Sequence, residues 1–233
     1  MGNSFLFFCF SLLICAILAV LAKRLTVIAA GVAYGIGLLV FFAMGGRELL
    51  MLCLFFILGV LATSHKKAYK TQLFALPKHE EIRTVGQVLA NGGVTGLLAI
   101  CCLIDSYHAD LYKIMMVGSL ASALADTLSS ELGIVYGRSF YNILTLKEDL
   151  GGRDGVVSIE GTLIGIVASA LMAFAYAGID KTTIFIALAG TLGNLFDSVL
   201  GASLERRHYL GNNGVNFLNT LFAAFVTLFF LLV

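Results

Sequence analysis

Two acidic residues, Asp126 and Glu131, lie within one long apolar run near the middle of the chain. At about 100° per residue in a helix, Asp126 shares a face with Ser122 and Ser130, whereas Glu131 lies about 140° around the helix from Asp126. A carboxylate in hydrocarbon requires a cation, a metal or a proton as its partner. We therefore expect Asp126 to face a neighbouring helix and Glu131 to reach a neighbouring loop.

A later apolar run combines an amide, an acid and a hydroxyl on a seam of glycines, at Asn194, Asp197 and Ser198. Two carboxylates on different helices at matching depth predict a divalent-metal site. Mg²⁺ binds a few carboxylate and amide oxygens together with phosphate oxygens and water. The predicted metal ligands are Asp126 and Asp197, with Glu131 and Asn194 as secondary candidates. Ser198 is a candidate phosphate ligand.

The connection over residues 137–160 is rich in glycine and contains Arg138 and Arg153. Glycines let backbone N–H groups approach an anion, and the N-terminus of the following helix adds a favourable dipole. Ser158 and Thr162 are the two candidates to cap that helix. Beside two arginines and an acid pair, this loop predicts a polyphosphate site. The Walker pattern G-x-x-x-x-G-K-[ST] is absent from the sequence, which excludes a P-loop enzyme.

Two further apolar runs begin with polar residues at the same expected depth. Arg83 and Asn91 flank the start of one run, and Asn213 and Asn216 flank the start of the last. We expect Arg83 to bind phosphate and the asparagines to complete a polar wall. The alternative is that serine, asparagine and glycine only join helices, as they commonly do in membranes. The cost of burying a carboxylate makes that alternative weakest for the two aspartates.

The elements that must position these residues are membrane-spanning helices. Of the 233 residues, 59% are hydrophobic and 12% are charged, and the mean hydropathy is +0.96. A soluble domain of this size could not bury so much apolar surface. The sequence therefore predicts an all-α, polytopic integral membrane helix bundle that forms a single domain over residues 1–233.

Eight apolar runs are long enough, or nearly so, to cross about 30 Å of hydrocarbon. They are Phe5–Ala22, Thr26–Met44, Leu49–Thr63, Val88–Ile104, Ile114–Tyr136, Gly161–Gly178, Ile184–Leu200 and Val215–Val233. The third run has 15 residues, which is short enough for a tilted partner or a half-helix.

The basic residues of the connections predict the orientation of the bundle. The connections after the first, third, fifth and seventh runs hold twelve lysines and arginines, whereas the alternate connections hold three. The positive-inside rule then places the twelve in the cytoplasm and both termini outside. The polar clusters described above would therefore lie on the cytoplasmic side of an inner or plasma membrane.

The segment 66–80, between the third and fourth runs, is too polar to span a membrane. Its lysines beside Tyr69 and Phe74 predict a short interfacial helix that ends near Pro77. Such a helix would anchor to anionic membrane lipids, with substrate gating as the alternative. The net charge of +1 gives no indication of nucleic-acid binding.

Four short motifs carry a resemblance to a known family. They are Gln87–Gly93, Ala125–Gly133, Gly155–Thr162 and Asp197–Ala202. Their order and spacing resemble the phytyl-phosphate kinase family, which also contains transmembrane protein 19 and was long labelled only as domain of unknown function 92. The resemblance covers roughly residues 83–216. One difference is the loop, where Gly151–Gly155 replaces the family's Pro-x-Gly-Thr-x-Gly.

The resemblance implies transfer of a phosphoryl group from a nucleoside triphosphate, such as CTP, to an isoprenoid monophosphate lipid. Because the acceptor is already an ionised phosphate, the reaction needs Mg²⁺ and arginines to bring two anions together rather than a strong general base. Two alternatives remain open. One is an ion- or proton-coupled transporter in which Asp126 and Asp197 carry the ion. The other is a CTP-dependent lipid-phosphate cytidylyltransferase, which would release pyrophosphate.

Overall fold

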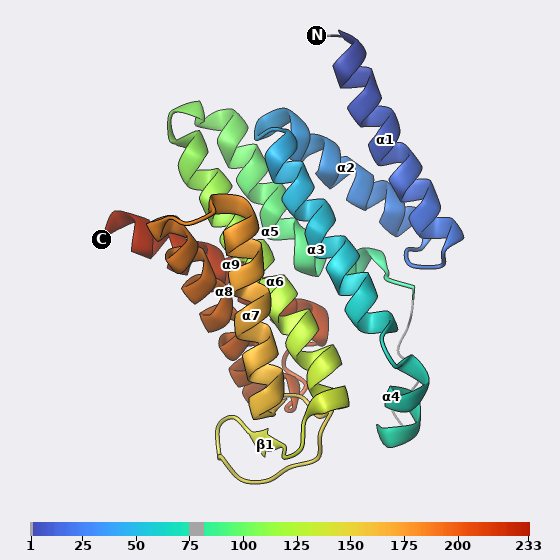
Figure 1. The fold of residues 1–233 in the computed structure, drawn as a ribbon, viewed down its shortest axis with the longest axis vertical. Helices are drawn as coiled ribbons and strands as arrows, with labels where there is room; N and C mark the ends of the chain where they lie inside the picture. The colour runs from blue at the N-terminus through green and yellow to red at the C-terminus, as the bar shows by residue number, and fades with distance from the viewer. Residues whose placement is uncertain (1, 75–81) are drawn as a thin grey trace.

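The computed structural model describes the backbone of residues 2–74 and 82–233 (Figure 1). The helices are α1 (Gly2–Leu21), α2 (Val27–Ala43), α3 (Gly46–Ser64), α4 (Lys67–Phe74), α5 (Val85–Ile104), α6 (Ala109–Tyr136), α7 (Ile159–Ala177), α8 (Lys181–Leu200) and α9 (Asn212–Leu232). Shorter elements are the 3₁₀ turn η1 (Ser106–His108), the π-helical turn η2 (Gly201–Glu205) and the strands β1 (Tyr141–Asn142) and β2 (Val156–Val157).

The long helices are apolar enough to span a membrane. Within the described residues, α3, α5, α6, α7, α8 and α9 have the required length and hydropathy, and α1 and α2 contribute shorter apolar helices. Their outward faces carry many exposed leucine, isoleucine and phenylalanine side chains, which suits contact with lipid rather than water. The structure confirms the predicted all-α integral membrane bundle.

The third apolar run is longer than the sequence indicated, because α3 has 19 residues and begins at Gly46. Its first turn includes two charged residues that the hydropathy pattern left in a loop. Arg47 lies 4.2 Å from the ring centroid of Tyr176 and donates a hydrogen bond to the carbonyl of that residue. The Tyr176 hydroxyl donates to Glu48 Oε1 at 3.3 Å. These partners let the charged turn join the helix, so α3 is neither short nor a half-helix.

Helix α6 is the centre of the bundle. It packs against α3, α5, α7, α8 and α9, whereas α1 packs mainly against α2 at the edge (Figure 1). The α6 segment from Met115 to Ala125 is buried throughout. A polar group within this segment is therefore held among neighbouring helices rather than exposed to lipid, and α6 is placed to supply the site.

Glycines allow the helices around α6 to approach closely. A Cβ atom added to Gly190 of α8 would lie 2.8 Å from the Cβ atom of Ala121, and one added to Gly133 of α6 would lie 3.0 Å from the Cα atom of Gly161. Neither distance leaves room for a methyl group. This close packing through small residues is the arrangement expected where helices associate in lipid.

The connections with most of the basic residues gather at one end of the bundle, which we call the basic end. Their described parts comprise residues 22–26, 65–74, 82–84, 137–158 and 201–211. Figure 1 shows α4 and the loop that carries β1 together at this end, away from the N-terminus. The cytoplasmic location of the basic end stays a prediction. Of the predicted interfacial helix 66–80, α4 forms the first part, and residues 75–81 lie outside the described residues.

Two backbone hydrogen bonds tie the start of α5 to the turn between α1 and α2. Thr26 N–H donates to the Arg83 carbonyl at 3.1 Å, and Arg83 N–H donates to the Arg24 carbonyl at 3.0 Å. Thr84 then caps α5 in a box with Gln87, whose side-chain oxygen accepts from Thr84 N–H at 2.9 Å. The start of α5 is thus held by the α1–α2 turn on one side and by its own capping box on the other.

Candidate active site

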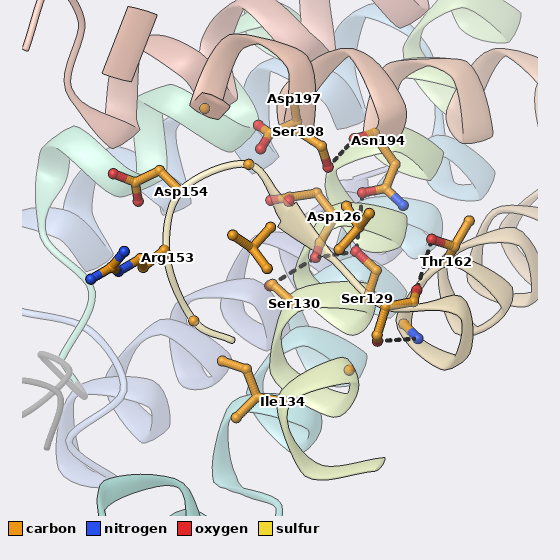
Figure 2. A pocket seen from close by; sticks show the side chains of 18 of the residues that line it. Asp126, Ser129, Ser130, Ile134, Arg153, Asp154, Thr162, Asn194, Asp197 and Ser198 are labelled. Carbon is orange, nitrogen blue, oxygen red and sulfur yellow. Dashed lines mark hydrogen bonds between the residues drawn. The ribbon is translucent and has the colours of Figure 1, made fainter. Parts of the chain in front are cut away.

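A cavity of about 240 Å³ lies at the basic end, where α6, α7 and α8 meet the loop before α7 (Figure 2). Its lining residues include four acids, one arginine, an amide and several hydroxyl groups: Asp126, Asp154, Asp197, Glu205, Arg153, Asn194, Ser129 and Ser198. We call residues 149–157, which close one side of it, the cavity loop. The cavity therefore brings together three helices and a loop that are distant in sequence.

The central feature of the cavity is the pair of carboxyl groups on Asp126 of α6 and Asp197 of α8. Both carboxyl groups line the cavity and lie close enough to interact electrostatically. Asn219 of α9 orients the second acid, because its Nδ2 donates to Asp197 Oδ2 at 2.6 Å. Ser122 in turn donates to Asn219 Oδ1 at 3.1 Å, which fixes the amide. Side chains from α6, α8 and α9 thus direct the two carboxyl groups into the same cavity.

Among the residues that the structure describes, the acid pair has no basic partner. Across residues 2–74 and 82–233, no ion pair involves Asp126 or Asp197, and no group of three or more His, Cys, Asp or Glu side chains is arranged for a metal. Two carboxylates without a closed protein cage fit Mg²⁺, which usually binds through one or two carboxylates plus phosphate oxygens and water. The donor set therefore fits the predicted ion.

Asn194 is held beside the acid pair by serines. Ser129 Oγ donates to Asn194 Oδ1 at 3.0 Å, and Ser198 Oγ donates to the Asn194 carbonyl at 3.3 Å. Asn194 is buried, and its side chain lies against Gly165 of α7, where a Cβ atom would collide with it. The amide can therefore support the cavity wall without displacing α7.

The cavity loop ends at the capped N-terminus of α7. Ser158 Oγ accepts a hydrogen bond from Gly161 N–H at 3.0 Å, and Thr162 Oγ1 donates to the Ser158 carbonyl at 2.9 Å. Both residues line the cavity. Ser158 thus acts first as a helix cap, and the N-terminal dipole of α7 is directed at the cavity.

Of the three predicted phosphate-binding arginines, Arg153 lines the cavity, whereas Arg138 and Arg83 do not. The Arg153 side chain points outward from the cavity loop (Figure 2) and forms an ion pair with Asp149 at 3.3 Å. Arg138 is exposed, and its backbone N–H lies 3.4 Å from Glu160 Oε2. The Arg83 guanidinium lies against Gly59 of α3, 5.8 Å from the Phe56 ring centroid, and burial lowers the pKa of its side chain. Their phosphate contacts stay predictions.

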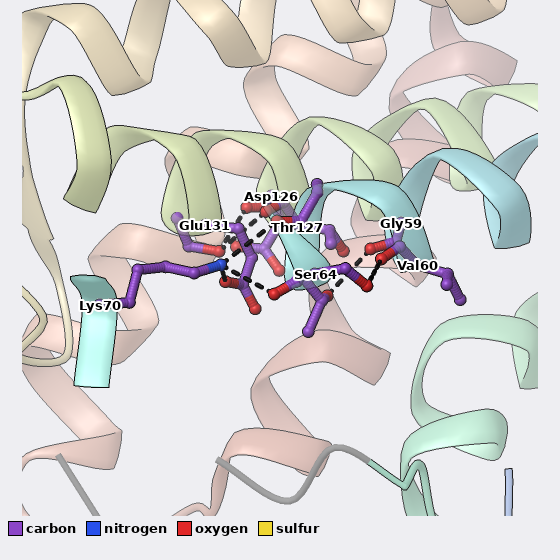
Figure 3. A network of polar contacts seen from close by, with 10 residues as sticks. Gly59, Val60, Ser64, Lys70, Asp126, Thr127 and Glu131 are labelled. Carbon is purple, nitrogen blue, oxygen red and sulfur yellow. Dashed lines mark hydrogen bonds and ion pairs between the residues drawn. The ribbon is translucent and has the colours of Figure 1, made fainter. Parts of the chain in front are cut away.

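Glu131 faces a different set of helices from Asp126. Its Oε2 lies 2.5 Å from Lys70 Nζ of α4 (Figure 3). The same ammonium group donates to the carbonyl of Thr63 at 2.9 Å and to that of Ala62 at 3.2 Å, at the end of α3. The Lys70 side chain is only 8% exposed. Glu131 therefore joins α6 to α3 and α4, and its predicted role as a metal ligand stays a prediction.

The predicted asparagines of α5 and α9 form a seam beside the cavity. Asn91 Nδ2 donates to the Gln87 carbonyl at 3.1 Å, and the Asn213 side chain lies against Gly86, where a Cβ atom would be 3.5 Å from its Cγ. The Oδ1 atoms of Asn91 and Asn216 are buried and accept no hydrogen bond from the described residues. The three asparagines lie on α5 and α9, which pack against each other. None of the three lines the cavity itself.

Comparison with known proteins adds the family. Residues 10–224 match the family described as Integral membrane protein DUF92. The chain belongs to this family. It is similar to the "Uncharacterized membrane protein MJ0933" of Methanocaldococcus jannaschii, with 34% identity over 91% of this chain and 89% of that protein.

Two further relatives come from Arabidopsis thaliana and Synechocystis. The chain is 29% identical to "Protein VTE6, chloroplastic" of Arabidopsis thaliana over 84% of this chain, and it spans 62% of that protein. It is also 29% identical to the "Uncharacterized membrane protein sll0875" of Synechocystis, over 88% of this chain and 82% of that protein. No solved structure matches the chain.

Sequence reasoning did not select Glu205, which lines the cavity of this DUF92-family protein. The residue follows Asp197 at a spacing that a regular helix would place about 80° around from it. The chain instead forms the π-helical turn Gly201–Glu205, in which Arg206 N–H donates to the Gly201 carbonyl at 3.2 Å. The sequence carries no pattern that predicts this turn, although such turns are frequent at functional sites.

Proposed function

We propose that the protein is a membrane-embedded phosphotransferase that transfers a phosphoryl group from a nucleoside triphosphate, such as CTP, to an isoprenoid monophosphate. The observation that carries the proposal is the facing pair Asp126 and Asp197 in a cavity at the basic end. The resemblance to the phytyl-phosphate kinase family supplies the reaction, and the positive-inside rule supplies a cytoplasmic site.

Asp126 and Asp197 would hold Mg²⁺, which neutralises charge on the phosphates when it is bound. Asn219 supports this role, because its hydrogen bond at 2.6 Å presents one Asp197 oxygen in a fixed direction. Asn194, held by Ser129, lies beside the pair as a neutral polar group. The residues thus orient the metal-binding oxygens before the substrates arrive, which reduces reorganisation during the reaction.

The polyphosphate would lie between the acid pair and the cavity loop. Gly152 and Gly155 have φ values of +81° and +68°, which turn the loop sharply at the cavity wall. The N-terminus of α7, capped by Ser158, adds a favourable dipole for an anion at the same place. Arg138 and Arg153 are on or beside this connection, and a rearrangement of their exposed side chains would bring positive charge to the phosphates.

A lipid acceptor suits the position of the cavity in the bundle. Ile159 and Leu163 at the start of α7 are 69% and 56% exposed on the outer surface of the bundle, close in sequence to the cavity residue Ser158. An isoprenoid chain could therefore stay in the membrane while its phosphate enters the polar cavity. Burial of the chain in lipid avoids exposing its apolar surface to water.

The direct test is an assay of purified protein in lipid nanodiscs with farnesyl, geranylgeranyl or phytyl phosphate and each of CTP, ATP, GTP and UTP. We expect an isoprenoid diphosphate and a nucleoside diphosphate, in equal amounts and only with Mg²⁺. Absence of diphosphate product with every pair, at every Mg²⁺ concentration, would overturn the proposal. Release of pyrophosphate instead would identify a cytidylyltransferase.

A transporter is the second candidate, because two neighbouring carboxyl groups in apolar helices can also carry a proton or a cation. Flux measurements in proteoliposomes separate the two functions. Ion flux that depends on Asp126 and occurs without nucleotide turnover would favour transport. The proposed phosphotransferase requires nucleotide turnover without such flux.

A further inference from the structure

Arg206 is a basic residue that the reaction described above does not use. Its guanidinium joins the cavity loop at two points: Nε donates to the Asp154 carbonyl at 2.6 Å, and Nη2 donates to Asp149 Oδ2 at 2.8 Å. The two accepting atoms are five residues apart in the loop. A planar guanidinium with several donors in fixed directions can bridge them, whereas a single ammonium group cannot match both directions.

The π-helical turn explains why Arg206 reaches the loop. Because Arg206 N–H donates to the Gly201 carbonyl, the turn contains one more residue than an α-helical turn. Without that residue, the side chain at position 206 would be rotated by about 100° about the helix axis. The same turn places Glu205 on the cavity wall. The π turn therefore directs neighbouring side chains to the cavity and to the loop that encloses it.

The backbone of the cavity loop also packs directly on this turn. A Cβ atom added to Gly201 would lie 2.8 Å from Gly155 N, and one added to Gly155 would collide with the backbone of Ala202. Gly155 also has a φ of +68°, so two independent constraints favour glycine there. Loop and turn are thus in backbone contact at Gly155, next to the Asp154 carbonyl that Arg206 binds, and the loop is held by packing as well as by hydrogen bonds.

Backbone hydrogen bonds connect the cavity loop to the segment around β1. Asp149 N–H donates to the Phe140 carbonyl at 3.0 Å, and Ile143 N–H donates to the Gly155 carbonyl at 3.1 Å. The backbone of Asp149 is therefore bound to Phe140, directly before β1, and its side chain is bound to Arg206 at the end of the π turn. Movement of this residue would displace the wall of the cavity from Gly152 to Val157.

We infer that Arg206 is a positioning residue that docks the cavity loop on the π turn at the end of α8 and so holds the loop wall of the nucleotide site. The assignment of the cavity to a nucleotide rests on the proposed function. Arg206 itself touches loop atoms and acts on the substrate only through the loop. Loss of the bridge should weaken nucleotide binding in the ground state and the transition state alike.

The experiment compares R206Q with R207Q, which changes the exposed neighbouring arginine, and with the conservative R206K, all as full-length protein in nanodiscs. Hydrogen–deuterium exchange of residues 141–157 is measured first. We expect R206Q to raise exchange in this segment, R206K to give an intermediate rise and R207Q to match the wild type. Exchange in α6 and α8 should be unchanged in all three. Wild-type exchange of the segment in R206Q would overturn the inference.

Steady-state kinetics with Mg²⁺–CTP and geranylgeranyl phosphate then separates positioning from a merely structural contact. We expect R206Q to raise the KM for CTP about tenfold while kcat changes less than about threefold. The reason is that the variant loses binding of the nucleotide that is equal in the ground state and the transition state. Faster exchange with an unchanged KM would overturn the positioning role. If the wild-type protein turns over no nucleotide, the proposed function fails, and the exchange comparison still decides whether Arg206 docks the loop.

Discussion

At the scale of single residues, the geometry of the two facing aspartates sets the chemistry. Each is held among helices, and within the part of the chain that the structure describes neither is paired with a basic side chain. Their like charges repel at close range, so a divalent cation would be favoured between them. Removal of one carboxylate should therefore affect metal use more than folding.

The first prediction concerns D126N and D197N. We expect each to lower kcat at least about 100-fold, because the amide keeps the shape of the side chain but loses the charge that binds Mg²⁺. D110N is the matched control, since Asp110 is an exposed acid at the other end of α6 that pairs with Lys113 at 3.0 Å. Equal activity of D126N and D110N in the phosphotransfer assay would contradict the prediction.

A second prediction concerns the ion pair between Lys70 and Glu131. K70M leaves a partly buried carboxylate without its partner and should lower the stability of the protein by up to about 3 kcal/mol. The double variant K70M/E131Q should recover part of that loss, because the unpaired charge is gone. Thermal unfolding in detergent measures both. K113M, which breaks an exposed ion pair, should cost less than about 1 kcal/mol, and an equal effect of K70M and K113M would refute the argument.

The third prediction concerns pH. The Arg206 hydrogen bond holds the pKa of Asp149 below its ordinary value of about 3.9. A lowered pKa in the folded state means that the ion pair stabilises the docked loop above the ordinary value and that this contribution is lost as pH falls through the lowered pKa. The loop should thus stay docked from about pH 5 to 8 and loosen only below about pH 4.

The absence of tryptophan from the chain makes this loosening easy to follow. F140W would place one fluorophore beneath Gly151, since a Cβ atom there would be 3.0 Å from the Phe140 ring. Its emission should change at acidic pH in the F140W protein and much less in F140W/D149N, where the bridge is already broken. The same acid response in both proteins would show that Asp149 is not its source.

Residue spacing alone predicted that Asp126 and Glu131 face different neighbours, because a helix fixes the angle between them. It could not predict the directions of Arg138 and Arg153. Those side chains belong to a loop whose path depends on Asp149, Gly155 and contacts with α8. Glu205 was missed for a related reason, since the π turn that directs it has no sequence signal.

At the scale of elements, apolar run length predicted the helices because hydrocarbon leaves backbone groups no other partner. The prediction underestimated α3, since Arg47 and Glu48 are charged but satisfied by Tyr176. The two-residue strands β1 and β2 were not predicted. They form only because the loop before α7 folds back on itself, with Tyr141 paired to Val157 and Asn142 to Val156.

The fourth prediction tests helix packing. G190A should destabilise the protein by about 1–3 kcal/mol, because the added methyl group would overlap Ala121 of α6. G31A in α2 is the control, since a Cβ atom there has nothing within 4 Å and replaces a flexible residue inside a helix. It should be neutral or stabilise by up to about 1 kcal/mol. Equal unfolding temperatures in detergent for G190A and G31A would contradict the packing argument.

At the scale of the whole molecule, the orientation is the property on which the proposed nucleotide site depends. The fifth prediction uses single cysteines in a background without the native ones. S106C, in η1, should react with a membrane-impermeant maleimide in intact cells, whereas R207C, at the basic end, should react only after permeabilisation. The reverse pattern would place the cavity away from cytoplasmic nucleotides and overturn the proposed function.

The central position of α6 has a consequence for synthesis. α6 carries Asp126, and Asp197 follows it by about 70 residues, so the first acid enters the membrane well before the second exists. Until α8 arrives, Asp126 lacks the neighbour that it faces in the finished bundle, and a carboxylate in the middle of a lone inserting helix costs about 3 kcal/mol. Helices α3 and α5, which are made earlier and pack against α6, can shelter it in that interval. The acid pair is therefore completed late in synthesis, after most of the helices around it are already in the bilayer.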